Sequence, residues 1–138
     1  MMNLQASLHA VLERPRDRLG DIFYLIFHEQ FPEVQSYFSG VNLRVQATML
    51  MNALQIVAAH RTNLHAATAE YLKILGHRHY VRGVPADLYP KFCDALLVAL
   101  ERFHGNDWNP ELAEEWRETL DLGIRAMLTG YVPGPMTY

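Results

Sequence analysis

Two histidines two residues apart, His77 and His79, lie in the stretch YLKILGHRHYVRGVPADLYP at residues 71–90. Because imidazole nitrogens bind transition metals, metal ligation is the first chemistry that this pair suggests. A zinc site on both rings is disfavoured, since an i, i+2 spacing brings side chains together on a strand and not on a helix. His79 shares a helix face with Leu72 and Leu75, whereas His77 points elsewhere, because a helix turns by about 100° per residue. A lone histidine on an apolar face is either a core residue paired with a backbone carbonyl or a cofactor ligand, and the pattern alone favours the core residue.

Two further polar side chains interrupt apolar faces. Gln46 lies one helical turn before Leu50 in the middle of an apolar stripe, so it is either at the helix rim or facing a ligand. Tyr24 lies at the edge of another stripe, beside Phe27, where a hydroxyl usually finds water or a backbone partner. These side chains define a site only if the fold brings them to one place.

The sequence segments that carry these residues all have the apolar periodicity of α-helices. Apolar residues recur at spacings of three and four along the chain, and no convincing strand or hairpin signal occurs. We therefore expect an all-α chain of about seven helices, several of them too short for a regular up-down bundle. Four stripes carry this expectation: Leu19, Ile22, Phe23, Ile26 and Phe27; Leu43, Leu50, Ala53, Leu54 and Val57; Phe92, Leu96, Leu100 and Phe103; and Trp116, Leu120, Ile124 and Met127.

Local breaks divide these helices. Pro15 separates a short first helix from the second, and Phe31 before Pro32 ends the second because a residue preceding proline avoids the helical region. Ser39-Gly40 forms a corner, and the stretch GVPAD at residues 83–87 separates the histidine helix from the next. Asn109-Pro110 opens the last helix with a capping side chain and a proline at the first helical position.

The composition limits the classes of protein. The chain has 138 residues, of which 50% are hydrophobic, and a formal net charge of −3, which suits a single domain with a real core. Scattered Lys and Arg residues give no nucleic-acid surface, and the apolar run at residues 95–100 is far too short to cross a membrane. One cysteine, Cys93, and an N-terminus without the pattern of a signal peptide lead us to expect a cytoplasmic protein.

Four pieces of the sequence, in order, resemble the globin family. Within that family the chain looks like the haem domain of flavohaemoglobins and their single-domain bacterial relatives, from about Phe23 to Trp116. The last piece is Glu115-Trp116 in the final helix. The other three are FYLIFHEQFPEVQSYF with Tyr24, Pro32 and Phe38; QATMLMNAL with Gln46, Leu50 and Asn52; and RHYVRGVPADLY with His79 and Tyr89.

The resemblance implies a fold and a cofactor. It implies a single globin domain over residues 1–138, with a short first helix, a haem pocket and an irregular tail at 130–138. His79 becomes the proximal ligand of the iron of haem b, because a histidine is the usual axial ligand of globins.

The resemblance also assigns roles around the cofactor. Phe38 packs on the porphyrin, Leu50 limits the space of the bound ligand, and Tyr89 orients the proximal imidazole. Tyr24 and Gln46 become distal residues whose donors stabilise negative charge on bound dioxygen.

The function implied is binding of dioxygen, and of other diatomics such as NO and CO, at a five-coordinate ferrous haem. One alternative is a nitric oxide dioxygenase that depends on a separate reductase, and another is a haem-based gas sensor. No glycine-rich dinucleotide fingerprint occurs after a strand pattern, so the sequence itself supplies no reductase site.

The sequence also departs from the family pattern. The corner between Phe38 and Gln46 is shorter than the one that the resemblance implies, which affects the depth of Gln46. The family's last helix carries a glutamate that completes a histidine–tyrosine–glutamate network. Counting on from Trp116, that position falls at Pro133, so we expect Tyr89 to orient His79 without an acid behind it.

Overall fold

The expected all-α architecture is confirmed. In the computed structural model, residues 2–13, 18–62 and 66–134 are described, and these ranges contain six α-helices, two short 3-10 helices and no strand. The predicted break at Pro15 lies outside the described residues. The helices are α1 (Leu4–Glu13), α2 (Arg18–Gln30), η2 (Pro32–Tyr37), α3 (Leu43–Thr62), α4 (Ala66–Val81), α5 (Leu88–His104), η3 (Gly105–Asp107) and α6 (Pro110–Leu128).

The helix ends follow the local chemistry of the sequence. Helix α2 ends at Gln30, and the chain then enters η2 at Pro32. At the start of α6 the side-chain oxygen of Asn109 accepts a hydrogen bond of 2.9 Å from the backbone N–H of Leu112, with Pro110 in the first turn. None of the described helices has a stretch that is long and apolar enough to cross a membrane.

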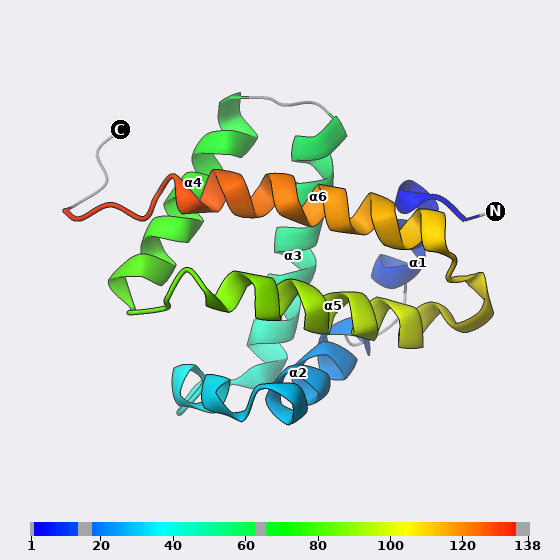
Figure 1. Cartoon of the computed structure of the whole chain (residues 1–138), viewed down its shortest axis with the longest axis horizontal. Coiled ribbons are helices and arrows are strands. Elements are labelled where there is room, and N and C mark those ends of the chain that lie inside the picture. Colours follow the sequence, from blue (N-terminus) through cyan, green and yellow to red (C-terminus); the bar gives the residue numbers. More distant parts are fainter. Residues whose placement is uncertain (1, 14–17, 63–65, 135–138) are drawn as a thin grey trace.

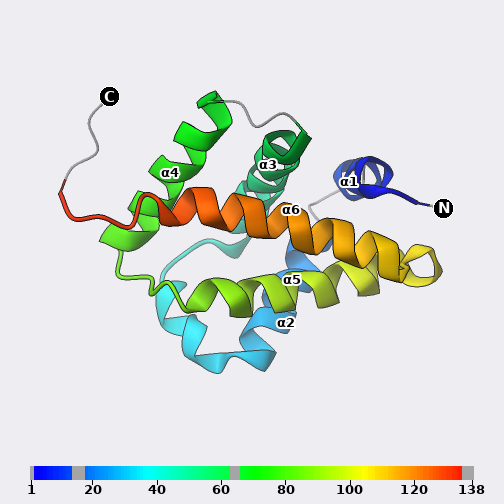
Figure 2. The same ribbon diagram turned by 45° about the horizontal axis from the view of Figure 1, so that its top comes forward.

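The helices cross one another around a shared core (Figure 1). Helices α5 and α6 run side by side, and α3 passes behind them against α6. Helix α2 packs on α5, while α4 crosses the C-terminal part of α6, as the turned view in Figure 2 also shows. The C-terminal end of α4 and the N-terminal end of α5 therefore meet on the side where α6 ends.

Most of the predicted stripe residues are buried, but α3 departs from the prediction at its start. Leu43 is its first residue and is 42% exposed, whereas Ala47, Leu50, Leu54 and Val57 are buried. The buried face of α3 thus begins one turn later than the pattern predicts. Gln46, at the edge of this face, is half-buried.

A buried hydrogen-bonded group ties α1 to the last two long helices. The indole N–H of Trp116 donates to the hydroxyl oxygen of Ser7 at 2.9 Å, and the same hydroxyl lies 2.6 Å from Nε2 of His104. Burial lowers the pKa of His104, although Asp107 opposes the shift. With a neutral ring, Ser7 donates to Nε2 and accepts from Trp116, so all three buried groups are satisfied.

Helix α4 crosses α6 at Gly76, where the backbones approach closely. A Cβ atom at Gly76 would overlap the main-chain carbonyl of Met127, which is not free to rotate away. Helix propensity favours alanine over glycine by about 1 kcal/mol, so only this crossing opposes the substitution.

We expect Gly76→Ala to destabilise the fold by about 1–3 kcal/mol, the usual cost of overpacking. The midpoint of thermal unfolding should fall by about 4 °C per kcal/mol. Urea and thermal unfolding check this result, with Glu70→Ala at an exposed position of the same helix as the control. An unchanged or raised stability of Gly76→Ala would show that α4 and α6 can separate without loss.

Candidate functional site

His79 and Tyr89 meet across the connection between α4 and α5. His79 lies in the last turn of α4 and Tyr89 in the first turn of α5. The chain turns back at Gly83, whose φ of 83° is in the left-handed region that favours glycine. The N–H of Val84 then donates to the carbonyl of His79 at 3.0 Å. This return places the Tyr89 hydroxyl 3.1 Å from Nδ1 of His79.

Tyr131 joins this pair from the segment that follows α6. Its hydroxyl lies 3.2 Å from the Tyr89 hydroxyl and 2.9 Å from the carbonyl oxygen of Val84. The rings of Tyr89 and Tyr131 make an edge contact with centroids 5.8 Å apart. Sequence reasoning missed Tyr131. Its position depends on where α6 ends, and no local pattern in the sequence fixes that.

Burial controls the charge of His79 and Tyr89. It lowers the pKa of the half-buried His79, with a smaller contribution from the positive charge of Arg82. It also raises the pKa of Tyr89, and the hydrogen bond with Tyr131 adds to this shift. Both side chains are therefore neutral near pH 7, and a neutral imidazole is the form that ligates a metal.

His77 is the histidine that takes the role of a core residue. It is 7% exposed, and its Nδ1 donates a hydrogen bond of 2.9 Å to the carbonyl of Gly130. The pairing of a core imidazole with a backbone carbonyl was the simpler interpretation of His79. The structure shows that pairing at His77, whereas His79 pairs with a side chain.

Tyr24 is the centre of the second predicted group. It is 9% exposed, and burial raises the pKa of its hydroxyl. The hydroxyl donates a long hydrogen bond of 3.4 Å to the main-chain carbonyl of Gln46. This contact joins α2 to the start of α3 through the backbone of Gln46 and not through its amide.

Phe38 contacts Tyr24, and Leu50 belongs to the same hydrophobic core as Tyr24. Phe38 follows η2, and its ring makes an edge contact with Tyr24 at a centroid distance of 5.4 Å. Leu50 is 6% exposed and belongs to the buried face of α3. Phe38 thus supplies apolar surface next to the Tyr24 ring, and Leu50 supplies apolar surface on the buried face of α3.

His28, one turn after Tyr24 on α2, was not singled out from the sequence. Its ring centroid lies 5.4 Å from that of Phe38 and 6.4 Å from that of Tyr24. Within the described part of the chain, its Nε2 atom is the buried side-chain polar atom that lacks a hydrogen-bond partner. A polar residue one turn beyond Tyr24 was visible in the sequence, and this spacing is the signal that could have found it.

Helix α5 links the two groups. Phe92, one turn after Tyr89, makes edge contacts with Phe23 at 5.0 Å and Phe27 at 6.2 Å on α2. The structure thus brings His79 to Tyr89, and Tyr24 to Phe38 and the backbone of Gln46. The roles of these residues toward a cofactor stay predictions.

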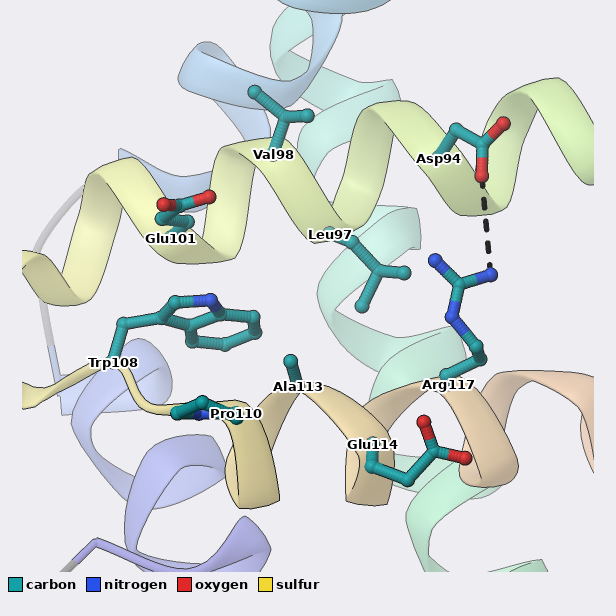
Figure 3. Close-up of a pocket in the computed structure, with 9 residues that line it drawn as sticks. All are labelled: Asp94, Leu97, Val98, Glu101, Trp108, Pro110, Ala113, Glu114 and Arg117. Carbon is teal, nitrogen blue, oxygen red and sulfur yellow. Dashed lines mark ion pairs between the residues drawn. The ribbon is translucent and has the colours of Figure 1, made fainter.

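A surface groove between α5 and the first half of α6 lies apart from these residues (Figure 3). It has a volume of about 510 Å³, with Trp108 at one end and the ion pair of Asp94 and Arg117, 4.0 Å apart, at the other. None of the six predicted site residues lines it. Its mixed charges and open shape give no reason to place the predicted chemistry there.

Comparisons with known proteins agree with the resemblance seen in the sequence. The family profile described as Globin matches residues 20–127. The chain is also similar to the flavohemoprotein of Bacillus subtilis (strain 168), with 26% identity over 110 residues. That alignment covers 78% of this chain and 27% of the relative, so the chain spans about a quarter of the relative's length.

Proposed function

The chain belongs to the globin family, and from this premise we propose that it binds haem with His79 as the proximal ligand of the iron. The observation that carries the proposal is the pairing of His79 Nδ1 with the Tyr89 hydroxyl at 3.1 Å. A hydrogen bond at Nδ1 fixes the tautomer and leaves Nε2 as the nitrogen that donates to a metal. The predicted roles of His79 and Tyr89 are thus compatible with the geometry.

The residues present fit a haem. The haem of a globin takes one axial imidazole, and it fits a largely apolar enclosure with a few polar groups. His79 supplies the imidazole, Phe38 and Leu50 supply apolar surface, and the buried Tyr24 supplies a polar group. Cys93 is the single cysteine, so the Cys-x-x-Cys-His attachment of c-type haem is excluded, and we propose non-covalent haem b.

Ferrous haem supplies reversible binding of diatomic gases, and we propose dioxygen as the ligand. Tyr24 would donate its hydroxyl hydrogen to the partial negative charge that bound dioxygen carries. A hydrogen bond to a charged group contributes about 1.5–3 kcal/mol, which slows release by roughly ten- to a hundredfold. The half-buried Gln46 is proposed as a second donor in the same place.

Oxidation of nitric oxide is a second candidate function. It is favoured by the similarity to the flavohemoprotein of Bacillus subtilis, of which the chain matches 27%. In this reaction nitric oxide, dioxygen and one electron yield nitrate, and we propose that a separate reductase supplies the electron. This chain would hold the dioxygen, with Tyr24 as donor, while nitric oxide enters.

Visible absorption spectra of the purified protein test the proposal. We expect a Soret band from one haem per chain and a five-coordinate, high-spin ferrous form. After exposure of the ferrous protein to air, we expect the spectrum of a stable oxygenated form. Pyridine haemochrome analysis should identify the haem as b-type. A protein that takes up no haem when hemin is added during expression would contradict the proposal.

A further inference from the structure

The hydroxyl of Tyr131 closes a chain of hydrogen bonds that begins at the His79 imidazole. The chain runs from His79 to Tyr89, from Tyr89 to Tyr131, and from Tyr131 to the carbonyl of Val84. Its members come from α4, the loop after α4, the first turn of α5 and the segment after α6. The contacts are between 2.9 and 3.2 Å, within the range of good hydrogen bonds.

The position of each proton follows from the last acceptor. A backbone carbonyl can only accept, so the single hydroxyl hydrogen of Tyr131 goes to Val84. The oxygen of Tyr131 is then left to accept from Tyr89. The oxygen of Tyr89 in turn accepts from the Nδ1–H of His79. One arrangement therefore satisfies all three donors, and it fixes the tautomer of His79.

The chain of hydrogen bonds behind His79 includes no carboxylate among the described residues. Among the described residues, no acidic side chain makes a hydrogen bond with His79, Tyr89 or Tyr131. Pro133, where counting along the sequence places the family's glutamate, is exposed. Behind Tyr89, the neutral phenol of Tyr131, two residues before Pro133, stands where the resemblance implies an acid.

The position of Tyr131 is fixed by the backbone of its neighbour. Gly130 lies directly against α4, because its carbonyl accepts from Nδ1 of His77 at 2.9 Å and a Cβ atom at Gly130 would overlap the carbonyl of Lys73. On the other side, Val84 is held by its own N–H, which donates to the carbonyl of His79. Both partners of the last hydrogen bond are thus anchored to the helix that carries His79.

We infer that Tyr131 is a positioning residue, which orients the Tyr89 hydroxyl so that His79 donates to a neutral acceptor. This inference rests on the proposed function, because it concerns the imidazole that would ligate the iron. Hydrogen bonds in a chain polarise one another, so the bond from Tyr89 to Tyr131 makes the Tyr89 oxygen a better acceptor for His79. Removing the Tyr131 hydroxyl weakens this acceptor and leaves the proximal imidazole less basic.

Resonance Raman spectra of the ferrous, haem-loaded full chain test the inference through the iron–histidine stretch. We expect Tyr131→Phe to shift this stretch to lower frequency. Tyr80→Phe is the matched control, because Tyr80 contacts the Tyr131 ring with centroids 5.5 Å apart but lies outside the chain of hydrogen bonds. Its stretch should equal that of the unaltered protein.

A double substitution separates positioning from general structural support. Tyr131 acts through Tyr89, so Tyr131→Phe should leave the stretch unchanged when Tyr89→Phe is already present. An unchanged or raised stretch in Tyr131→Phe alone, or loss of haem in Tyr131→Phe but not in Tyr80→Phe, would overturn the inference. The absence of any iron–histidine stretch in the unaltered ferrous protein would instead overturn the proposed ligation by His79, so the two failures are distinguishable.

Discussion

We expect His79→Ala to abolish stable haem uptake, because we propose that the His79 imidazole is the axial ligand of the iron. The substitution also lowers the apparent stability, because a ligand that binds only the folded chain stabilises it by mass action. With free haem at about a thousandfold its dissociation constant, this contribution is about 4 kcal/mol. The haem-to-protein ratio and thermal unfolding of the haem-loaded and haem-free chain measure the two effects.

His77→Ala is the matched control on the same helix. His77 is buried and donates to Gly130, so its removal should lower stability while the chain still takes up haem. His79→Gly offers a direct test of the ligand role, because the space left by the ring can admit free imidazole. Added imidazole should restore haem binding to His79→Gly and not alter His77→Ala. Haem retained by His79→Ala with an unchanged ferrous spectrum would show that another residue is the ligand.

Helix ends were predictable because their chemistry is local. Pro32 and the Asn109-Pro110 pair fix the end of α2 and the start of α6 through backbone sterics and one side-chain cap. The contact between His79 and Tyr89 was also expected, although from family resemblance and not from the residues alone. The loop of residues 82–87 is short enough that the end of α4 and the start of α5 have few ways to meet.

The partners that arrive from distant segments were not predictable in this way. Counting along the last helix from Trp116 points to Pro133 only if the helix continues in register, but α6 ends at Leu128 and the chain leaves the helical path through a turn at Thr129 and Gly130. Tyr131 therefore reaches Tyr89 because of where the helix stops. Similarly, the apolar periodicity of α3 predicts that Leu43 is buried, but Leu43 is exposed. This could not be predicted, because nothing in a single sequence says which neighbouring helix covers the first turn of α3.

Tyr24→Phe should speed the release of dioxygen by about tenfold or more, the scale of one hydrogen bond to a charged group. The substitution keeps the ring, and hence its edge contacts with Phe23 at 4.8 Å and Phe38 at 5.4 Å, so the packing of α2 is preserved. Among the described residues the hydroxyl has a single hydrogen-bond partner, the carbonyl of Gln46 at a long 3.4 Å. Exchanging so long a bond for one to a charged ligand costs little, which favours a role as donor.

Stopped-flow release rates for dioxygen and carbon monoxide separate this role from a change in pocket shape. Carbon monoxide carries little charge, so its release should change much less than that of dioxygen in Tyr24→Phe. Tyr71→Phe, at an exposed tyrosine of α4, controls for the loss of a hydroxyl elsewhere. Gln46→Leu should act in the same direction but more weakly, because Gln46 is half-buried at the edge of α3 and Tyr24 contacts its backbone. Equal acceleration of both gases would mean that Tyr24 limits access to the iron sterically, and no acceleration of either would mean that its hydroxyl stays on Gln46 when the ligand binds.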